Sequence, residues 1–444
     1  MKKFLSLLLV ALMLVSIVAC GGKDDETSSV NPDSSQTVNE ENDAVSADVE
    51  SDDAESIDVE ASEDLPSVPS LEGKDLSDLT FGLICLHDEN STYDKNFIQA
   101  MYEAQEALGL SDDQVKIVTN IPEGSECYDA AVELVEDYDC DIVFANSFGH
   151  ETYMIQAAKE YPEVEFCHAT GTMAHTEKLD NFHNAFASIY EGRYLAGIAA
   201  GLKLNEMIEN GDITADEAKM GYVGAFPYAE VKSGYTSFYL GAKSVCPSVT
   251  MDVKFTNSWY DEALEKEAAL ALIDSDCVLI SQHADSMGAP SACEQAGVPN
   301  VSYNGSTVEA CPNTFIVSSR INWAPYYEYI VACWANDVAI PADWCGGINE
   351  GSVVLTDVNS KAAAEGTVDA IEAAKKEIVD GTRYVFDTAN FTVAGEKISS
   401  YLADVDTDAA FTKDTEVVKD GIFVESIYRS APYFDIDIDG ITIK

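Results

Sequence analysis

Short apolar runs alternate with helix-like segments along most of this chain. The run from Asp141 to Ala145 breaks at residues 146–149 and leads into a helix-like segment that ends near Tyr161, which is the pattern of a buried strand feeding a helix. Such an alternation predicts an α/β fold with a parallel sheet and helices on both faces. The other strands expected in this half are 79–86, 115–119, 164–168 and 182–187, with helices at 96–108, 127–136 and 152–160.

The same pattern restarts after a segment whose apolar residues at 190, 194, 195, 198 and 202 form a helical face. Its strands are expected at 220–224, 250–255, 277–281 and 299–303, with helices at 230–245, 261–273 and 287–296. The repetition predicts two hinged lobes. The expected N-lobe is 79–188 with a return segment at about 320–350, and the expected C-lobe is 189–319 with part of 351–444. Residues 386–420 have mixed periodicity and are expected to form an insertion on a lobe surface.

The first residues have the layout of a bacterial lipoprotein signal. Lys2 and Lys3 precede an apolar run from Phe4 to Ala19, and Cys20 follows. By similarity to such signals, Cys20 is the lipid-modified first residue of a mature protein held on the extracytoplasmic face of the cell membrane. An uncut signal anchor is the alternative. Residues 21–78 are rich in Asp, Glu and Ser without aromatic residues, which predicts a disordered tether or an acidic interaction tail.

Charge and cysteine usage narrow the class of partner. The net charge is −54, which argues against nucleic acid and anionic lipid as partners, because both are bound through clustered Lys and Arg. A neutral or weakly cationic small molecule fits this balance better. Eleven cysteines are present, and those other than Cys20 are expected to be mostly free, buried thiols.

Signatures of catalysis are missing from the sequence. It contains no phosphate-binding loop, no dinucleotide fingerprint and no nucleophile elbow, so neither an enzyme nor a cofactor is expected. The spacing of His168, His175 and His183 matches no usual metal pair, and these residues are expected to be structural. His283 follows a predicted strand and is a better site candidate. A hydrolase built on it, with a nearby Ser and Asp, would lack an ordered oxyanion hole.

Aromatic, acidic and amide side chains gather where the expected strands end. Because carboxyl ends of parallel strands line the crevice of an α/β sheet, two facing lobes would bring these side chains to one cleft. A flat heteroaromatic ring suits such a cleft, since stacking on an aromatic side chain contributes about 1–3 kcal/mol. The strand-end candidates are Tyr93, Phe97, Phe148, Phe226, Trp259, Asp285, Asn304 and Trp323.

Several segments together resemble the basic membrane protein (Bmp) family of ABC-transporter substrate-binding lipoproteins. They cover about residues 79–380 and begin at Asn146, His168, Tyr190, Phe226, Phe238, Asn257, Gln282, Asn322 and Trp344. The resemblance implies a two-lobed type I periplasmic-binding-protein fold, a purine base or nucleoside as ligand with adenine-like bases favoured, and an ABC permease as partner. A monomer is expected.

The resemblance also implies roles for individual residues. Asp94 would contact the base, Phe97 would stack on it and Phe226 would supply the second ring. Asn304 lies where the nucleoside branch has a ribose-binding Asp. The matching segments add Asn146 and Glu230 to the expected ligand contacts. Three alternatives stay open: a receptor for riboflavin or another vitamin, an enzyme acting on nucleosides, and a sensing rather than an importing role.

Overall fold

The fold is described for residues 65–444 from a computed structural model. The predicted signal segment, Cys20 and the predicted tether up to residue 64 lie outside the described residues. Residues 65–78 have little secondary structure, yet Leu65 and Leu76 pack against the core of the first lobe. Contacts of that lobe therefore begin before the expected boundary at 79. Among the helices described, none is long and apolar enough to span a membrane.

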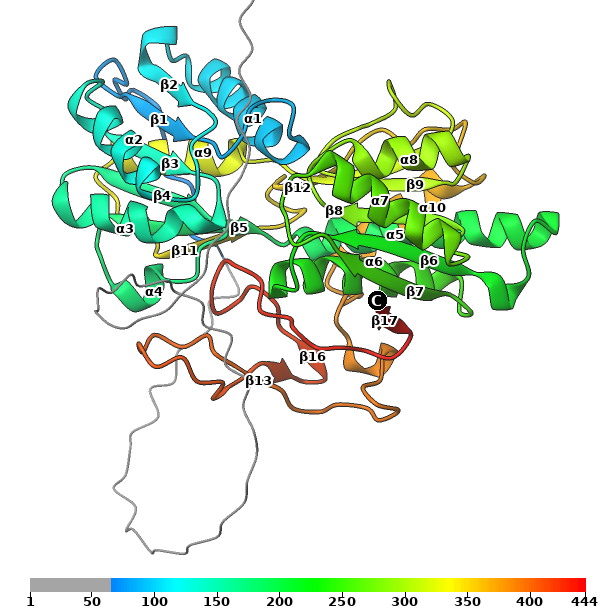
Figure 1. The fold of residues 1–444 in the computed structure, drawn as a ribbon. Helices are drawn as coiled ribbons and strands as arrows, with labels where there is room; N and C mark the ends of the chain where they lie inside the picture. The colour runs from blue at the N-terminus through cyan, green and yellow to red at the C-terminus, as the bar shows by residue number, and fades with distance from the viewer. Residues whose placement is uncertain (1–64) are drawn as a thin grey trace, which may run out of the picture. The chain divides into compact units, whose positions relative to one another are not determined.

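The first lobe is built on a six-stranded parallel sheet (Figure 1). Its strands stand in the order β11-β5-β4-β3-β1-β2, and every neighbouring pair is parallel. β3 is apolar and fully buried, as expected of a strand covered on both faces. The elements are β1 (Phe81–Ile84), α1 (Thr92–Leu108), β2 (Val115–Val118), α2 (Ser125–Glu136), β3 (Ile142–Ala145), α3 (Glu151–Glu160), β4 (Glu165–Ala169), α4 (Ala174–Glu177), β5 (Phe182–Ala187), α9 (Ala324–Ala335) and β11 (Asp343–Gly346).

The second lobe has a seven-stranded sheet in the order β12-β10-β9-β8-β6-β7-β17. Only the β10–β12 pair of this sheet is antiparallel. Its elements are α5 (Ile189–Asn210), β6 (Lys219–Gly224), α6 (Ala229–Val245), β7 (Thr250–Phe255), α7 (Glu262–Asp274), β8 (Leu279–His283), α8 (Gly288–Ala296), β9 (Asn300–Tyr303), β10 (Phe315–Ile321), β12 (Val353–Leu355), α10 (Thr367–Val379) and β17 (Ile441–Ile443). The prediction of an α/β fold with parallel sheets and helices on both faces is confirmed.

Helices α5 and α6, the first two of the second lobe, pack closely against each other. A Cβ atom at Gly197 would lie 2.0 Å from the Phe238 carbonyl oxygen, and one at Gly241 would lie 2.0 Å from that of Tyr194. No real Cβ approaches backbone so closely, so glycine at these positions lets the two helices touch. The sequence Gly-Ile-Ala-Ala-Gly at 197–201 thus sets the interhelical distance.

The chain crosses between the lobes three times: after β5, after β10, and between β11 and β12. Crossings from the first lobe leave β5 and β11, which form one edge of its sheet. That edge is therefore the hinge side of the lobe.

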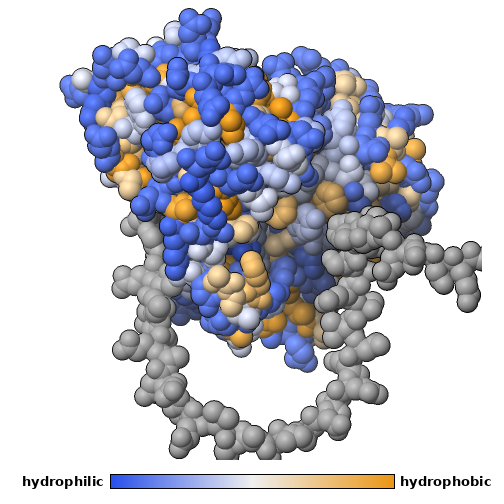
Figure 2. All heavy atoms as spheres, turned by 60° about the vertical axis from the view of Figure 1, so that its left-hand side comes forward, coloured by the Kyte–Doolittle hydropathy of each residue, from blue (hydrophilic) through white to orange (hydrophobic). Residues whose placement is uncertain are grey.

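The C-terminal segment, residues 382–444, packs mainly on the second lobe. Phe386, Phe391, Phe423 and Phe434 lie in its core, and β17 extends its sheet beside β7. The expected surface insertion at 386–420 holds only for part of that range: Phe386 and Phe391 are each 1% exposed, whereas Phe411 is 84% exposed. The segment also contains the two-residue strands β13 (Leu402–Ala403), β14 (Thr415–Glu416), β15 (Val418–Lys419) and β16 (Ile422–Phe423). On the face shown in Figure 2, hydrophilic side chains predominate and apolar ones lie in scattered patches.

Candidate ligand-binding site

A small cavity lies where the carboxyl ends of strands from the two lobes meet. The first lobe lines it from the loops after β1, β3 and β4 and from the start of α1, with Leu86, Tyr93, Ser147, Phe148 and Thr170. The second lobe lines it with Glu230, Trp259, His283 and Asp285. Strand polarity explains this convergence, since every contributing strand ends at the edge facing the cavity. The cavity lies in the middle of the first sheet, away from the hinge strands β5 and β11.

Direct contacts between the lobes surround the cavity. The backbone N–H and the hydroxyl of Thr92 both donate to the carbonyl oxygen of Asp285, at 3.0 and 3.1 Å. The side-chain amide of Asn96 donates to that of Asn304 at 3.1 Å, and the rings of Phe148 and Tyr228 lie 5.5 Å apart. Only about 20 Å³ is open to the centre of a water molecule, little more than the room one water needs. A ligand of purine size would therefore need the lobes to separate before it enters, and the lobes would close around it less fully than they do here.

The side-chain carboxyl group of Asp285 is available to form hydrogen bonds with a ligand. Its backbone N–H donates to Trp259 and its carbonyl oxygen accepts from Thr92, so both backbone groups are occupied. The side chain lines the cavity at 6% exposure, and none of the described residues donates a hydrogen bond to its carboxylate. Burial, together with the charges of Asp94, Glu265 and Glu230, raises its pKa well above the usual value. Its environment thus favours the neutral carboxyl group, which can both donate and accept a hydrogen bond.

Glu230 and His283 form the wall beside Asp285. The His283 Nε2 atom lies 3.3 Å from a carboxylate oxygen of Glu230, and burial lowers the pKa of this histidine. Behind them, the buried Arg193 guanidinium lies 3.5 Å from the centre of the Tyr303 ring and donates to the Gln282 carbonyl oxygen at 3.1 Å. This cation partly balances the acids of the second lobe without reaching the cavity.

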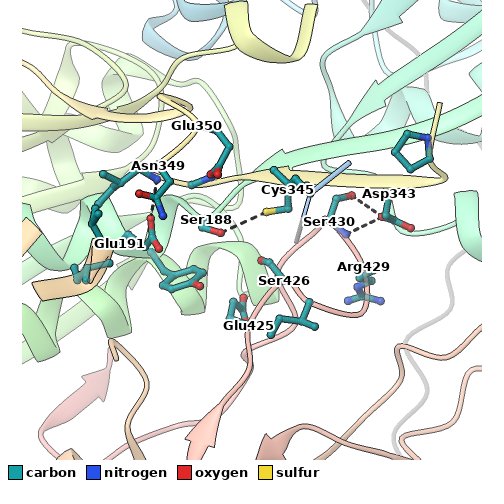
Figure 3. Close-up of a pocket in the computed structure, with 18 of the residues that line it drawn as sticks. Ser188, Glu191, Asp343, Cys345, Asn349, Glu350, Glu425, Ser426, Arg429 and Ser430 are labelled. Carbon is teal, nitrogen blue, oxygen red and sulfur yellow. Dashed lines mark hydrogen bonds between the residues drawn. The ribbon is translucent and has the colours of Figure 1, made fainter. Parts of the chain in front are cut away.

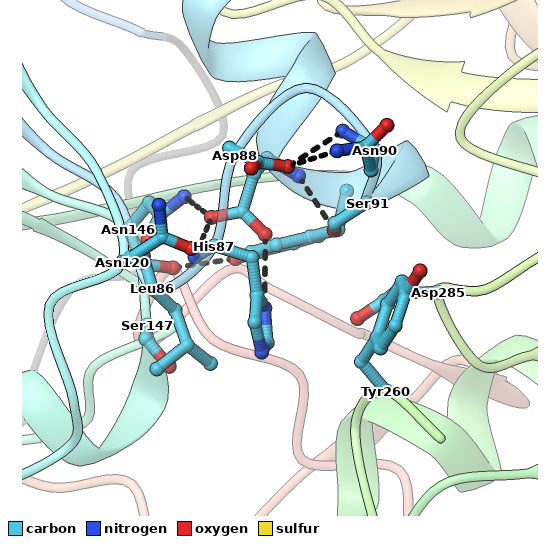
Figure 4. Close-up of polar contacts among 12 residues, drawn as sticks. Leu86, His87, Asp88, Asn90, Ser91, Asn120, Asn146, Ser147, Tyr260 and Asp285 are labelled. Atoms are coloured by element: carbon cyan, nitrogen blue, oxygen red, sulfur yellow. Dashed lines mark hydrogen bonds and ion pairs between the residues drawn. The ribbon is translucent and has the colours of Figure 1, made fainter. Parts of the chain in front are cut away.

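The first lobe holds its wall in place through a buried polar network (Figure 4). Asp94 is fully buried and accepts hydrogen bonds from the His87 backbone N–H at 3.0 Å and from the Asn146 amide at 2.7 Å. Burial opposes ionisation, yet hydrogen bonds from His87, Asn146 and Ser91 leave the pKa of Asp94 below its usual value. The Tyr93 hydroxyl donates to the Asn146 carbonyl oxygen at 2.7 Å. Asp94 and Asn146 therefore position the loops and Tyr93 and do not themselves line the cavity.

The residues expected at the site fall into three groups. Tyr93, Phe148, Glu230, Trp259 and Asp285 line the cavity. Phe226 lies next to this wall, stacked on Tyr228 with 5.2 Å between ring centres and edge-on to Trp259 at 4.9 Å. The others lie behind the cavity wall, in the polar network, at the lobe contact or in the core of the first lobe: Asp94, Asn146, Asn304, Phe97 and Trp323.

Phe97 and Trp323 differ most from their expected role. They stack on each other, with ring centres 4.5 Å apart, and are 0% and 1% exposed in the core of the first lobe. Phe144 also meets the Trp323 ring edge-on at 5.7 Å. In this arrangement both faces and edges of these rings serve packing, so the role expected of them as ligand-stacking rings is not supported by their placement.

Three residues that line the cavity were not among the site residues expected from the sequence. Leu86, Ser147 and Thr170 each come within two residues of the end of a strand, so the rule that located Phe148 also applied to them. Small and aliphatic residues were passed over because they carry no distinctive chemistry. In the described part of the chain, the one group of acids close enough to share a metal ion is Asp406, Asp408 and Asp414, which is in the C-terminal segment and not in the cavity.

Comparisons with known proteins agree on the class of protein. Residues 81–385 match the family described as Bmp, ABC transporter substrate-binding protein PnrA-like. A purine-binding protein of Brucella abortus is 30% identical over 306 residues, which are 67% of this chain and 82% of that protein. A putative ABC transporter glucose-binding protein of Haloferax volcanii is 33% identical over 247 residues, 54% of this chain and 58% of that protein. A solute-binding protein of an ABC transporter system from Aeropyrum pernix has a similar structure, with a TM-score of 0.57 at 15% identity over 68% of this chain and 92% of that one.

Proposed function

Because the chain belongs to the Bmp family of ABC transporter substrate-binding proteins, we propose that it encloses an adenine-like purine between its lobes and delivers it to an ABC permease. The family assignment confirms the resemblance seen in the sequence. Substrate-binding proteins of this class act outside the cytoplasm. The lipid anchor predicted at Cys20 would hold this one at the membrane, and a Cys20→Ser variant would then carry no lipid by mass spectrometry.

The observation that carries the ligand proposal is the buried Asp285 carboxyl group in an aromatic-walled space. Tyr93 and Phe148 on one lobe and Trp259 on the other supply aromatic rings around it. A neutral carboxyl group donates one hydrogen bond and accepts another, which matches the ring nitrogen and the adjacent amino group on the edge of adenine. An ionised carboxylate would instead suit two adjacent N–H donors, as on guanine.

The Haloferax relative, described as a putative glucose-binding protein, gives a rival ligand class. Hexoses present hydroxyl groups around the whole ring, so their recognition needs polar partners on several sides. Here the polar side chains of the cavity, Glu230, His283 and Asp285, lie together on the second lobe, and the first lobe offers hydroxyls from Tyr93, Ser147 and Thr170. The Tyr93 hydroxyl is already used by Asn146. The asymmetry favours a ligand read along one edge.

The test is mass spectrometry of any co-purifying molecule, followed by calorimetry and thermal shift with adenine, guanine, adenosine, glucose and riboflavin. At a ligand concentration one hundred times Kd, binding should stabilise the protein by about 2.7 kcal/mol. Adenine should be recovered chemically unchanged after incubation. A shift with glucose but with no purine would refute the proposal, and a flavin absorption spectrum would favour the vitamin alternative.

Two substitutions at Asp285 test the protonation state directly. Asn keeps one donor and one acceptor in the same plane, so Asp285→Asn should bind adenine within about threefold of wild type. Asp285→Ala removes both groups and should weaken binding at least tenfold, in keeping with about 1–3 kcal/mol for an unsatisfied buried group. If Asp285→Asn loses as much affinity as Asp285→Ala, the neutral-acid reading is wrong and a guanine-like edge is favoured.

A further inference from the structure

A second, larger cavity lies on the hinge side of the protein (Figure 3). About 460 Å³ lies in a partly open hollow that is lined mainly by three parts of the chain. These are the crossing into α5, β11 with the crossing that follows it, and the C-terminal segment, and apolar side chains are added by Leu65, Pro66, Ile378 and Val379. The polar side chains that line it are Ser188, Glu191, Asp343, Asn349, Glu350, Glu425, Ser426, Arg429 and Ser430.

Glu425 is a buried acid in this cavity that lacks a hydrogen-bond partner for part of its carboxylate. It is 3% exposed, and one carboxylate oxygen accepts from the Tyr433 backbone N–H at 3.1 Å. Its other oxygen, Oε2, is buried and has no hydrogen-bond partner among the described residues, and the same holds for the neighbouring Ser426 hydroxyl. A buried carboxylate oxygen without a hydrogen-bond donor destabilises the fold, so a ligand that donates to this oxygen would supply the missing hydrogen bond.

The charge around Glu425 is predominantly negative. Glu191, Asp343 and Glu350 also line the cavity, and Arg429 is its one cation among the described residues. The Arg429 guanidinium donates to the backbone carbonyl oxygens of residues 404, 431 and 432. Its hydrogen bonds are therefore directed to the backbone.

Each of the other three acids already accepts at least one hydrogen bond from the protein. Glu191 accepts from the Ile348 backbone N–H at 3.0 Å, Glu350 from that of Gly347 at 2.8 Å, and Asp343 from the Ser430 backbone and hydroxyl at 2.7 and 2.6 Å. Burial raises the pKa of Glu191 to about 7 and that of Glu425 to about 8. Both acids would be stabilised in their ionised form by a positive charge placed between them.

From this geometry we propose that the hinge cavity binds a small organic amine cation, with Glu425 as its principal partner. The ammonium group donates to Glu425 Oε2 and is balanced by Glu191 and Glu350, and the Tyr190 ring adds an aromatic surface of the kind that attracts ammonium groups. Glu425–Ser430 lie beyond residue 385, where the family match ends. The C-terminal segment thus supplies the principal acid of this site, which shares no lining residue with the purine cavity.

The test is calorimetry with 1,4-diaminobutane and choline as probes in 150 mM salt, with uncharged 1,4-butanediol as the control ligand. At least one cation should bind saturably with one molecule per chain, and butanediol should give no heat. Glu425→Gln keeps the acceptor for Tyr433 but removes the charge and should weaken binding at least tenfold. Glu191→Gln should act in the same direction and decides the matter if Glu425→Gln melts early.

Glu365→Gln is the matched control, because Glu365 is exposed and lies outside the cavity, so the variant loses the same charge elsewhere. Its affinity for the amine should stay within twofold of wild type. Equal losses of affinity in the three variants would mean that amines bind the acidic surface in general, which would overturn the proposal. The proposal would also fail if neither probe bound saturably up to 10 mM, or if both cavity variants kept the affinity of wild type. Adenine affinity of Glu425→Gln should equal that of wild type, so this test and that of the purine site fail independently.

Discussion

Replacing Trp323 by Ala should destabilise the first lobe, whereas replacing Phe148 by Ala should weaken ligand binding and leave stability nearly unchanged. Trp323 is 1% exposed, stacks on Phe97 at 4.5 Å and contacts Phe144 edge-on. Truncating a Trp in such a core costs about 3–5 kcal/mol through lost burial and the cavity left behind. Phe148 is 41% exposed beside the interlobe cavity, so its truncation leaves no closed hole.

Melting temperature and adenine affinity, measured on the same preparations, separate the two roles. At about 2 °C per kcal/mol for a lobe of this size, Trp323→Ala should melt roughly 6–10 °C below wild type. Phe148→Ala should melt within about 2 °C of wild type and bind adenine about tenfold more weakly, because a stacking ring contributes about 1–3 kcal/mol. Trp323→Phe is the control for ring retention and should recover most of the lost stability.

The reverse result would refute this reasoning. If Trp323→Ala melts with wild type but loses adenine binding, Trp323 must turn toward the ligand when the lobes open, and the core position seen here would not be the one that binds. If Phe148→Ala binds adenine as well as wild type, the aromatic wall of the first lobe does not contribute to affinity.

Two further predictions follow from contacts around the cavity and in the first lobe. Thr92→Val removes the hydroxyl that donates to the Asp285 carbonyl oxygen across the lobes. Loss of this hydrogen bond should cost about 1 kcal/mol and raise the adenine Kd, measured by calorimetry, about fivefold. An unchanged Kd would show that closure of the lobes does not depend on this bond. Burial lowers the pKa of His150 and His168 to about 4, so the stability that each contributes is present above the unfolded pKa of about 6.5 and is lost as pH falls toward 4, on the order of 3 kcal/mol per residue. Denaturant unfolding at pH 7 and pH 4.5 should show this loss, and His168→Gln should reduce it.

The strands and most helices were predictable because burial leaves a plain pattern. β3 is apolar along its whole length, and the helices between strands keep one apolar face. Helix starts were less clear: α1 begins at Thr92, four residues before the expected start, because the Ser91 hydroxyl caps it by accepting from the Asp94 N–H. A polar residue at a helix start reads as loop until its partner is known.

Strand ends located the cavity but did not say which side chains face it. Tyr93 and Phe97 are four residues apart on one face of α1, so about one helical turn separates them along the axis. That turn is enough to put Tyr93 at the cavity and Phe97 in the core. Asp94 was expected to read the ligand, yet its donors come from His87 and from Asn146, which is 52 positions away. Such long-range pairing leaves no local mark in the sequence.

The C-terminal segment could not be placed because its structure depends on partners far along the chain. β17 has three residues and exists only through pairing with β7, and the four phenylalanines that enter the second core have no regular spacing. The same segment reaches the first lobe through Ser430, which donates to Asp343 on β11. Because β11 is a hinge-edge strand, movement at this contact should be small when the lobes separate around the purine cavity. The segment can therefore hold both lobes without preventing their opening, and a cation bound beside Glu425 would contact the part of the chain that moves least.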